Sequence, residues 1–148
     1  MLIDLHTHSN ASDGTDTPAQ LIDKAINKGL DVIALTDHDT TRGWEEATQA
    51  LLHHPSQSQM QLVLGSEISC QDENGISIHM LGLLFDPTFT PLIDELDKTR
   101  ENRLSRMEKI VARLNEAGID ITIEEVHAQR KGDATLGRPH LADALVAR

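Results

Sequence analysis

A strand–loop–helix–strand pattern in the first 36 residues constrains the fold more than any other feature of this chain. Residues 2–6 predict a short strand, and the polar residues 7–16 predict a loop. A helix is predicted after Thr17, because Thr-Pro-Ala-Gln supplies an N-cap, a proline at N1 and the glutamine of a capping box, and Gly29 is suited to end it. Residues 31–36 are almost entirely apolar, as in a strand buried on both faces. The pattern therefore predicts a parallel strand pair with a crossover helix, and an α/β fold.

The rest of the sequence predicts a second helix, a β-hairpin and then a mainly helical region. The hairpin is indicated by Asn74-Gly75, a strong signal for a tight turn between strands. Residues 119–123 are compatible with either a short strand or an extended link. The expected elements are a helix at 44–52, strands at 62–69 and 76–85, one long helix or two helices at 91–118, and helices at 124–130 and 139–148.

Composition limits what this fold can do. The length of 148 residues favours one domain, and only Trp44, Phe85 and Phe89 are aromatic, so the core must be built from Leu, Ile, Val and Ala. The scarcity of aromatic side chains argues against a base-stacking platform. A net charge of −11 argues against an extended basic surface for double-stranded nucleic acid. A single cysteine excludes an internal disulfide framework and a cysteine-based zinc finger.

No apolar segment is long enough to predict a membrane span. The first residues lack the basic and apolar regions of a signal peptide. We therefore expect no membrane association and a cytoplasmic location.

Histidine and acidic residues gather at the predicted ends of the strands. His6 and His8 are two residues apart at the end of the first strand, so both imidazoles project to the same side. Asp13 follows on a loop that Gly14 allows to turn sharply. His38 comes directly after the second strand, and parallel α/β folds bind their ligands at this edge of the sheet. These groups predict a shared metal site.

Glu67 and His79 are unusual because both lie in otherwise apolar strand regions, where a carboxylate is costly unless it is paired or bound to metal. Each motif alone has an ordinary explanation: a chance His-x-His pair, an Asp that caps a helix, or a Glu that faces solvent. Their occurrence together at several strand ends favours the metal site. The residues alone leave His140 undecided, and the histidines expected to be solvated or structural are His53, His54 and His127.

Five segments, HTHSNASDGT, ALTDHDT, GSEIS, IHMLGLLFD and GRPHLA, occur in this order along nearly the whole chain. Together they resemble the PHP superfamily (polymerase and histidinol phosphatase), in particular its nucleotide phosphoesterases and 5′-to-3′ exoribonucleases. The resemblance implies a distorted (βα)7 barrel with two to three divalent metal ions, Mn²⁺, Zn²⁺, Fe²⁺ or Mg²⁺, at the carboxyl ends of the strands. It also implies hydrolysis of phosphate esters of nucleotides or of the 5′ ends of short RNA.

The resemblance further implies seven metal ligands in three sites. His6 and His8 would bind the first metal, and Glu67 would bridge the first and second metals. His79 and His140 would complete the site of the second metal. Asp13 and His38 would hold the third metal.

The candidate catalytic residues are Asp37 and Arg138. Asp37, like Asp39, is expected to fix the orientation of an imidazole. Arg138 is expected to contact the substrate phosphate. Arg103 and Arg106 lie three residues apart on a predicted helix, where they form either a basic rim that binds substrate or a solvated face paired with Glu101 and Glu108.

The chain departs from the family pattern after His140, because it lacks the late Asp-x-His motif that family members carry on a strand. We therefore expect residues 1–148 to form a single PHP-like domain that is incomplete at its C-terminus and corresponds to the N-terminal half of a family member. Residues 91–132 would be a helical insertion within it. The expected fold is a partial distorted (βα)7 barrel. Self-association of the chain could cover the unfinished sheet of this barrel.

Two alternatives to a phosphoesterase stay open. An amidohydrolase-like C–N hydrolase would share the early His-x-His motif, although Asp13-Gly14 and the Thr-Asp-His motif at 36–38 favour the phosphoesterase, and no lysine is placed for carbamylation in a strand. The other alternative is a metal-binding fragment without catalytic activity.

Overall fold

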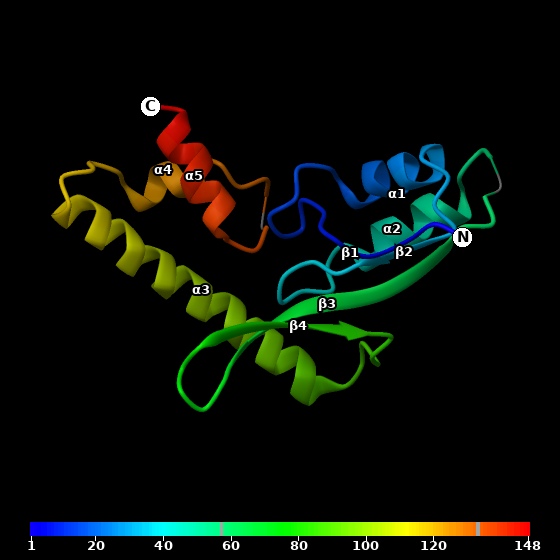
Figure 1. Cartoon of the computed structure of the whole chain (residues 1–148), viewed down its shortest axis with the longest axis horizontal. Coiled ribbons are helices and arrows are strands. Elements are labelled where there is room, and N and C mark those ends of the chain that lie inside the picture. Colours follow the sequence, from blue (N-terminus) through cyan, green and yellow to red (C-terminus); the bar gives the residue numbers. More distant parts are fainter. Residues whose placement is uncertain (57, 133) are drawn as a thin grey trace.

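The computed structural model describes residues 1–56, 58–132 and 134–148, which form an α/β structure with one four-stranded sheet (Figure 1). The elements are β1 (Ile3–Thr7), α1 (Pro18–Asn27), β2 (Val32–Leu35), α2 (Trp44–Leu52), β3 (Gln61–Gln71), β4 (Ser77–Leu83), α3 (Thr90–Glu116), α4 (Ile123–His127) and α5 (Arg138–Val146). The strand order is β1-β2-β3-β4, with parallel pairing among the first three strands and antiparallel pairing of β3 with β4. The predicted α/β class is confirmed, and the open, curled sheet agrees with a partial barrel.

Helix α1 begins as the sequence predicts. The Gln20 N–H donates to the Thr17 hydroxyl at 3.2 Å, and the Thr17 N–H donates to the Gln20 side-chain oxygen at 3.0 Å. This reciprocal pair satisfies two backbone donors at the helix start. The chain leaves the helix at Gly29, whose φ of +74° is accessible to glycine without strain.

The first hydrophobic core lies between the sheet and helices α1 and α2. Ile22 of α1, Ile33 of β2 and Trp44 of α2 are buried in it. The Trp44 indole N–H donates to the Gly65 carbonyl at 2.9 Å, which anchors α2 to β3. Residues 1–89, which contain this core, are termed the sheet unit.

The second core is formed by α3, α4 and α5. Met107 and Val111 of α3 pack there against Ile121 and Val126. Residues 119–122 are an extended link and not a strand, because the Asn115 side chain bonds both the N–H and the C=O of Ile121 and replaces a neighbouring strand as their partner. Residues 90–148 are termed the helical unit.

Polar contacts connect the two units, whose buried clusters share no residue. The Thr135 N–H donates to the Ala11 carbonyl at 3.0 Å, and the Lys131 ammonium donates to the Thr15 carbonyl at 2.6 Å. Both bonds attach the helical unit to the loop after β1. In Figure 1 the carboxyl ends of β1 and β2 face the helical unit, so any site at that edge of the sheet lies between the two units.

The two edges of the sheet carry exposed apolar side chains. Leu2, Ile3 and Leu5 at β1, and Ile78 and Met80 on β4, are each at least 41% exposed. These edges are positions where a further strand could pair. Among the described residues, no helix is both long and apolar enough to cross a membrane.

Candidate metal centre

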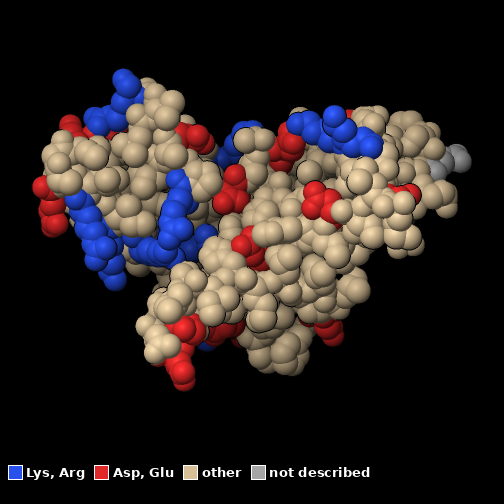
Figure 2. Space-filling view, in the orientation of Figure 1, with Lys and Arg blue, Asp and Glu red and all other residues tan. Residues whose placement is uncertain are grey.

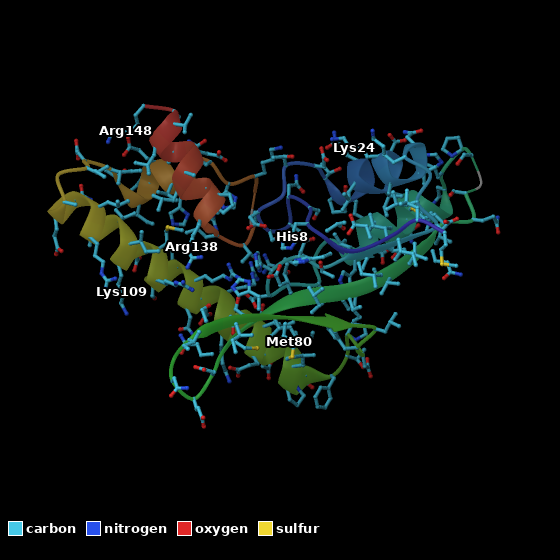
Figure 3. All side chains as sticks on the ribbon, viewed as in Figure 1. His8, Lys24, Met80, Lys109, Arg138 and Arg148 are labelled. Carbon is cyan, nitrogen blue, oxygen red and sulfur yellow. The ribbon has the colours of Figure 1, made fainter. Side chains whose placement is uncertain are left out.

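Four strands deliver ionisable side chains to one edge of the sheet: His6 and His8 come from β1 and the residue after it, His38 from the segment after β2, Glu67 from β3 and His79 from β4. Alternation along the strand puts His6 and His8 on the same side, with ring centroids 5.1 Å apart. The register pairs Glu67 with Leu81, which makes His79 a diagonal neighbour of Glu67 on the same face. Figure 3 shows the resulting cluster of side-chain nitrogen atoms beside His8.

Glu67 is at the centre of this group. Its Oε2 lies 2.7 Å from Nε2 of His6, 2.8 Å from Nε2 of His8 and 3.7 Å from Nδ1 of His38, and its Oε1 lies 2.6 Å from Nδ1 of His79. Burial raises the pKa of Glu67, but the hydrogen bonds with His6 and His79 outweigh it and lower the pKa overall. The carboxylate is therefore held ionised, which is the form that binds cations.

A second carboxylate, Asp13, joins from the loop after β1. Its Oδ1 lies 2.9 Å from Nδ1 of His8, and its Oδ2 lies 3.6 Å from Nε2 of His38. Burial raises the pKa of Asp13, but the hydrogen bond with His8 and the charges around it bring the pKa down to about 2. Burial lowers the pKa of His8, but Asp13 and Glu67 raise it overall. Gly14 makes the loop possible, because a Cβ at this position would clash with the His8 carbonyl.

His38 is nearly enclosed, with 8% of its surface exposed. Burial and the positive charge of Arg103 lower the pKa of His38 to about 4, so the ring is neutral at neutral pH. Its Nδ1 is buried and finds no hydrogen-bond partner among the described residues. A neutral imidazole with an unpartnered ring nitrogen is suited to bind a metal ion.

The donor set fits divalent cations. Three overlapping groups have ligand atoms that all lie within 4.8 Å of one another, namely His6–His8–Glu67, His8–Asp13–His38 and His38–Glu67–His79. Every donor is an imidazole nitrogen or a carboxylate oxygen, which suits Mn²⁺, Zn²⁺, Fe²⁺ or Mg²⁺ and does not select one of them. Residues shared between groups are what a centre for more than one cation requires.

Asp37 is buried beside the metal-ligand groups and bonds to the loop after β1. It is 1% exposed, and its carboxylate accepts hydrogen bonds from the Ser9 N–H at 2.8 Å, the Ser9 hydroxyl at 2.7 Å and the Ser12 hydroxyl at 2.6 Å. The expected hydrogen bond between Asp37 and an imidazole is not found among the described residues, whose side-chain and backbone bonds to this carboxylate come from the two serines. Asp37 instead holds the loop that carries Asp13. Sequence reasoning missed Ser9 and Ser12, for which the only signal was their place between two ligands in one loop.

Among the described residues, Asp39 likewise makes no hydrogen bond with an imidazole, and it is paired with Arg103 of α3. Its fully buried carboxylate accepts from the Arg103 Nε at 2.6 Å, from the Ser69 N–H at 2.7 Å and from the Ser69 hydroxyl at 2.9 Å. The second guanidinium contact runs from Nη2 of Arg103 to the Ser69 hydroxyl at 2.6 Å. Arg103 therefore does not form the solvated face paired with Glu101 and Glu108; it bonds to Asp39 and Ser69. Arg103 attaches the helical unit to the segment that carries His38.

A cavity of about 150 Å³ opens between the metal-ligand groups and the helical unit. Asp13, His38 and His79 line one side of it, and the other side carries Arg103, Arg106 and Arg138. Figure 2 shows the surface hollowed between the two units, with basic side chains gathered on the helical unit. The Asp13 carboxylate and two imidazoles therefore face guanidinium groups across one small space.

His140 does not join the three groups. Its Nδ1 accepts the Gly137 N–H at 3.0 Å and so closes the N-terminus of α5. This bond occupies Nδ1, so the metal-binding role expected of His140 stays a prediction that would involve Nε2. The start of α5 lies beside the site, since a Cβ at Gly137 would be 3.2 Å from the Asp13 Oδ2. That position is what brings the next residue, Arg138, to the cavity.

The three histidines expected to have no role in the site lie outside these groups. His54 lies 3.2 Å from the carboxylate of Asp23, a residue of α1, and His53 is exposed at the end of α2. His127 lies on α4 in the helical unit.

Relatives of known description match nearly the whole chain but only half of their own length. A 5′-3′ exoribonuclease of Haemophilus influenzae is 38% identical over 97% of this chain and 50% of its own sequence. A 3′,5′-nucleoside bisphosphate phosphatase of Chromobacterium violaceum is 35% identical over 97% of this chain and 49% of its own. The chain thus spans about half the length of the curated relatives it matches.

Solved structures give the same picture. A protein of Bifidobacterium adolescentis assigned as a metal-dependent phosphoesterase superimposes with a TM-score of 0.85 at 43% identity, covering 98% of this chain and 49% of that one. A protein of Chromobacterium violaceum described as an amidohydrolase, with bound sulfate and no metal, gives a TM-score of 0.86 at 34% identity over 99% of this chain and 50% of that one. The family model described as the PHP domain matches residues 4–148. On this match, and with the resemblance of its motifs confirmed, the chain belongs to the PHP domain family.

Proposed function

We propose that this chain carries the metal centre of a phosphoesterase that hydrolyses phosphate monoesters or diesters of nucleotides or of short RNA 5′ ends. The observation that carries the proposal is the small cavity in which Asp13, His38 and His79 face Arg106 and Arg138. One wall can hold cations and the other can hold an anion. A phosphate ester is a substrate that needs both.

The ligands we propose for the cations are the six residues of the three overlapping groups, His6, His8, Asp13, His38, Glu67 and His79. Bound divalent cations supply Lewis acidity that polarises the phosphate ester and makes hydroxide available near neutral pH. We propose two to three such ions, because the three groups share His8, His38 and Glu67.

The protein's own cationic residues orient the phosphate. Arg138 is placed at the cavity by the cap of α5, and its planar guanidinium can bind two phosphate oxygens at once. Arg106 faces the cavity from α3 and adds charge on the same side. Arg103 contributes mainly through Asp39 and Ser69, because those residues occupy its Nε and Nη2.

The names of the relatives support nucleotide substrates. The Haemophilus influenzae protein is called an exoribonuclease, and the Chromobacterium violaceum protein a nucleoside bisphosphate phosphatase. Both share with this chain the half that contains the six proposed ligands.

The test is metal-dependent hydrolysis by the purified chain. Adenosine 3′,5′-bisphosphate and a 5′-phosphorylated tetraribonucleotide are incubated with the chain after loading with Mn²⁺, Zn²⁺, Fe²⁺ or Mg²⁺, and metal content is measured in parallel. We expect bound metal and release of phosphate or mononucleotide that a chelator abolishes. Bound metal without turnover would support the inactive metal-binding fragment in place of the enzyme.

The amidohydrolase-like alternative is favoured by one observation, the description given to the similar Chromobacterium violaceum structure. Against it, none of the four described strands carries a lysine that could be carbamylated. Hydrolysis of a dihydropyrimidine or N-acyl amino acid panel, without hydrolysis of the phosphate esters, would decide for the alternative.

We also propose that the exposed apolar edges of the sheet promote self-association of this chain. Leu5 on β1 and Met80 on β4 are 41% and 56% exposed, although they sit on strands that can still accept a neighbour. Sedimentation of the chain over a range of concentrations tests this, and a monomer throughout would refute it.

A further inference from the structure

A second and larger cavity lies next to the candidate metal centre. It has a volume of about 650 Å³ and is bounded by the β3–β4 hairpin on one side and by α3 on the other. Arg103 and Arg106 line both this cavity and the smaller one, so the two spaces meet at these side chains. At about 150 Å³ the smaller cavity has room for a phosphate group, whereas the larger falls in the range of roughly 300–1,000 Å³ typical of small-molecule sites.

The lining of the larger cavity changes along α3. Toward the metal centre, Arg106 and Lys109 supply positive charge. Toward the start of the helix, Leu92 and Leu96 supply apolar surface beside the carboxylate of Glu95, which pairs with Lys98 at 3.3 Å. At 1.5 Å per residue, the stretch of helix from Leu92 to Arg106 spans about 21 Å. One end of the cavity is therefore suited to a phosphate and the other to an apolar ring.

Polar side chains lie between these two ends. Thr99 and Asn102 of α3 face Gln71 of β3 across the cavity, and all three offer hydrogen-bonding groups. None of the described lining residues is aromatic, so an apolar ring would be held by burial and hydrogen bonds and not by stacking.

We propose that this cavity, termed the nucleoside groove, binds the nucleoside whose phosphate lies at the metal centre, with Arg106 at the junction. The proposal rests on the proposed function and adds the place where the nucleoside of its substrate binds, which a phosphate monoester of a small alcohol would leave empty. The charge of the groove agrees with it, since the cations lie at the end that adjoins the metal centre and the apolar side chains at the other.

The first test fills the groove. Thr99 is half-buried and lines the groove, whereas the side chain of its neighbour Lys98 is 66% exposed and lies outside it. Thr99→Trp and Lys98→Trp therefore place the same bulky side chain inside and outside the groove on one helix. For adenosine 3′,5′-bisphosphate we expect KM to rise about tenfold in Thr99→Trp, because the indole displaces the nucleoside and removes a hydrogen bond with the threonine hydroxyl, and to change less than about twofold in Lys98→Trp.

Phenyl phosphate, which has no nucleoside, is the companion substrate. We expect its KM and kcat to be the same in both variants and in the unmodified chain. Equal losses on phenyl phosphate and on the nucleotide, or no loss on either, would overturn the groove. Asn102→Trp repeats the test from a neighbouring turn of α3 if Thr99→Trp does not fold.

A binding experiment keeps the groove separate from the reaction. Adenosine 5′-monophosphate is titrated into the chain in the presence of Mg²⁺, and backbone amide resonances are followed by NMR. We expect shifts at Cys70, Thr99 and Asn102. The dissociation constant obtained from these shifts should rise about tenfold in Thr99→Trp, as the KM does, and about tenfold in Arg106→Gln. Turnover need not occur for this result, so a chain that binds the nucleotide here without hydrolysing any ester refutes the proposed function and retains the groove. Shifts confined to residues at the metal centre refute the groove alone.

Discussion

The sheet unit and the helical unit divide the chemistry of the site between them. Ten of the 13 Lys and Arg residues lie in residues 90–148, whereas the acidic residues are nearly even, with 13 of 24 in residues 1–89. The sheet unit therefore carries most of the net charge of −11, and the helical unit is close to neutral. All six proposed metal ligands belong to the sheet unit, and Arg103, Arg106 and Arg138 belong to the helical unit.

The difference explains how an acidic chain can present a site for an anion. Parallel strands end together, so the sheet gathers carboxylates and imidazoles that attract cations. The helical unit brings guanidinium groups to the same edge from a distant part of the sequence. A phosphate would meet positive charge on both sides only while the two units are docked.

The ion pair between Arg103 and Asp39 holds the helical unit on the sheet unit. Of the substitutions considered, Arg103→Gln is expected to lower the unfolding free energy most. The substitution leaves the fully buried Asp39 carboxylate without its charged partner, and losing one partner of a buried pair costs about 3 to 5 kcal/mol of unfolding free energy. Denaturant unfolding measures the loss, and Arg113→Gln on the exposed face of the same helix is the control. Equal stability of the two variants would show that Arg103 does not hold the units together.

The separateness of the two cores is tested by Ile22→Ala in the sheet unit and Ile121→Ala in the helical unit. Each side chain is 1% exposed, and each truncation is expected to cost about 2 to 4 kcal/mol through lost burial and a cavity. Because the two clusters share no residue, each loss should appear mainly in its own unit by native-state hydrogen exchange. Leu52→Ala, at a position 70% exposed, is the control. A uniform loss of protection across both units would mean that they unfold as one body.

Glu67→Gln tests whether the sheet unit binds the cations. The carboxylate contacts four imidazoles and belongs to two of the three metal-ligand groups, so we expect metal uptake to fall and ester hydrolysis to drop about a hundredfold, near 2.7 kcal/mol. Metal analysis and initial rates measure both. The isosteric change Glu73→Gln in the hairpin turn is the matched control. Unchanged metal content in Glu67→Gln would remove Glu67 from the centre.

The smallest effect is a pH dependence far from the site, in the hairpin turn of the sheet unit. The hydrogen bond from the Ile76 N–H, with those from Asn74, lowers the pKa of Asp72 below its ordinary value of 3.8. A lowered pKa in the folded state means that the contribution to stability is complete above 3.8 and is lost as the pH falls through the lower, folded value. NMR shifts of the turn should therefore change at a midpoint below 3.8, and Asp72→Asn should abolish that change. A midpoint at or above 3.8 would contradict the assignment.

Local patterns predicted the elements well where the responsible interactions are local. The capping box at Thr17, the turn at Asn74-Gly75 and the apolar run of β2 each act within a few residues, so their spacing carries the information. The sequence could not decide between a strand and an extended link at residues 119–123. The backbone of Ile121 bonds to the Asn115 side chain, and no strand or helix pattern indicates this partner.

The candidate site divides in the same way. Strand alternation and the common edge of parallel strands were enough to expect His6, His8, His38 and Glu67 to be close together. The partners of buried carboxylates were not predictable: Asp37 bonds to Ser9 and Ser12, and Asp39 bonds to Arg103, 64 residues away. Any of several polar residues could have satisfied these groups, and only the packing selects which one does.

By itself, the sequence determined which side chains stand at the carboxyl ends of the strands, because strand periodicity and parallel pairing leave them no other edge. Only the tertiary structure decided how the helical unit completes the site. It turns His140 into the cap of α5, makes Arg103 a docking residue and brings Arg106 and Arg138 to the cavity. The reason is physical: the position of one unit on another depends on a few long-range polar contacts, and such contacts leave no periodic trace in the sequence.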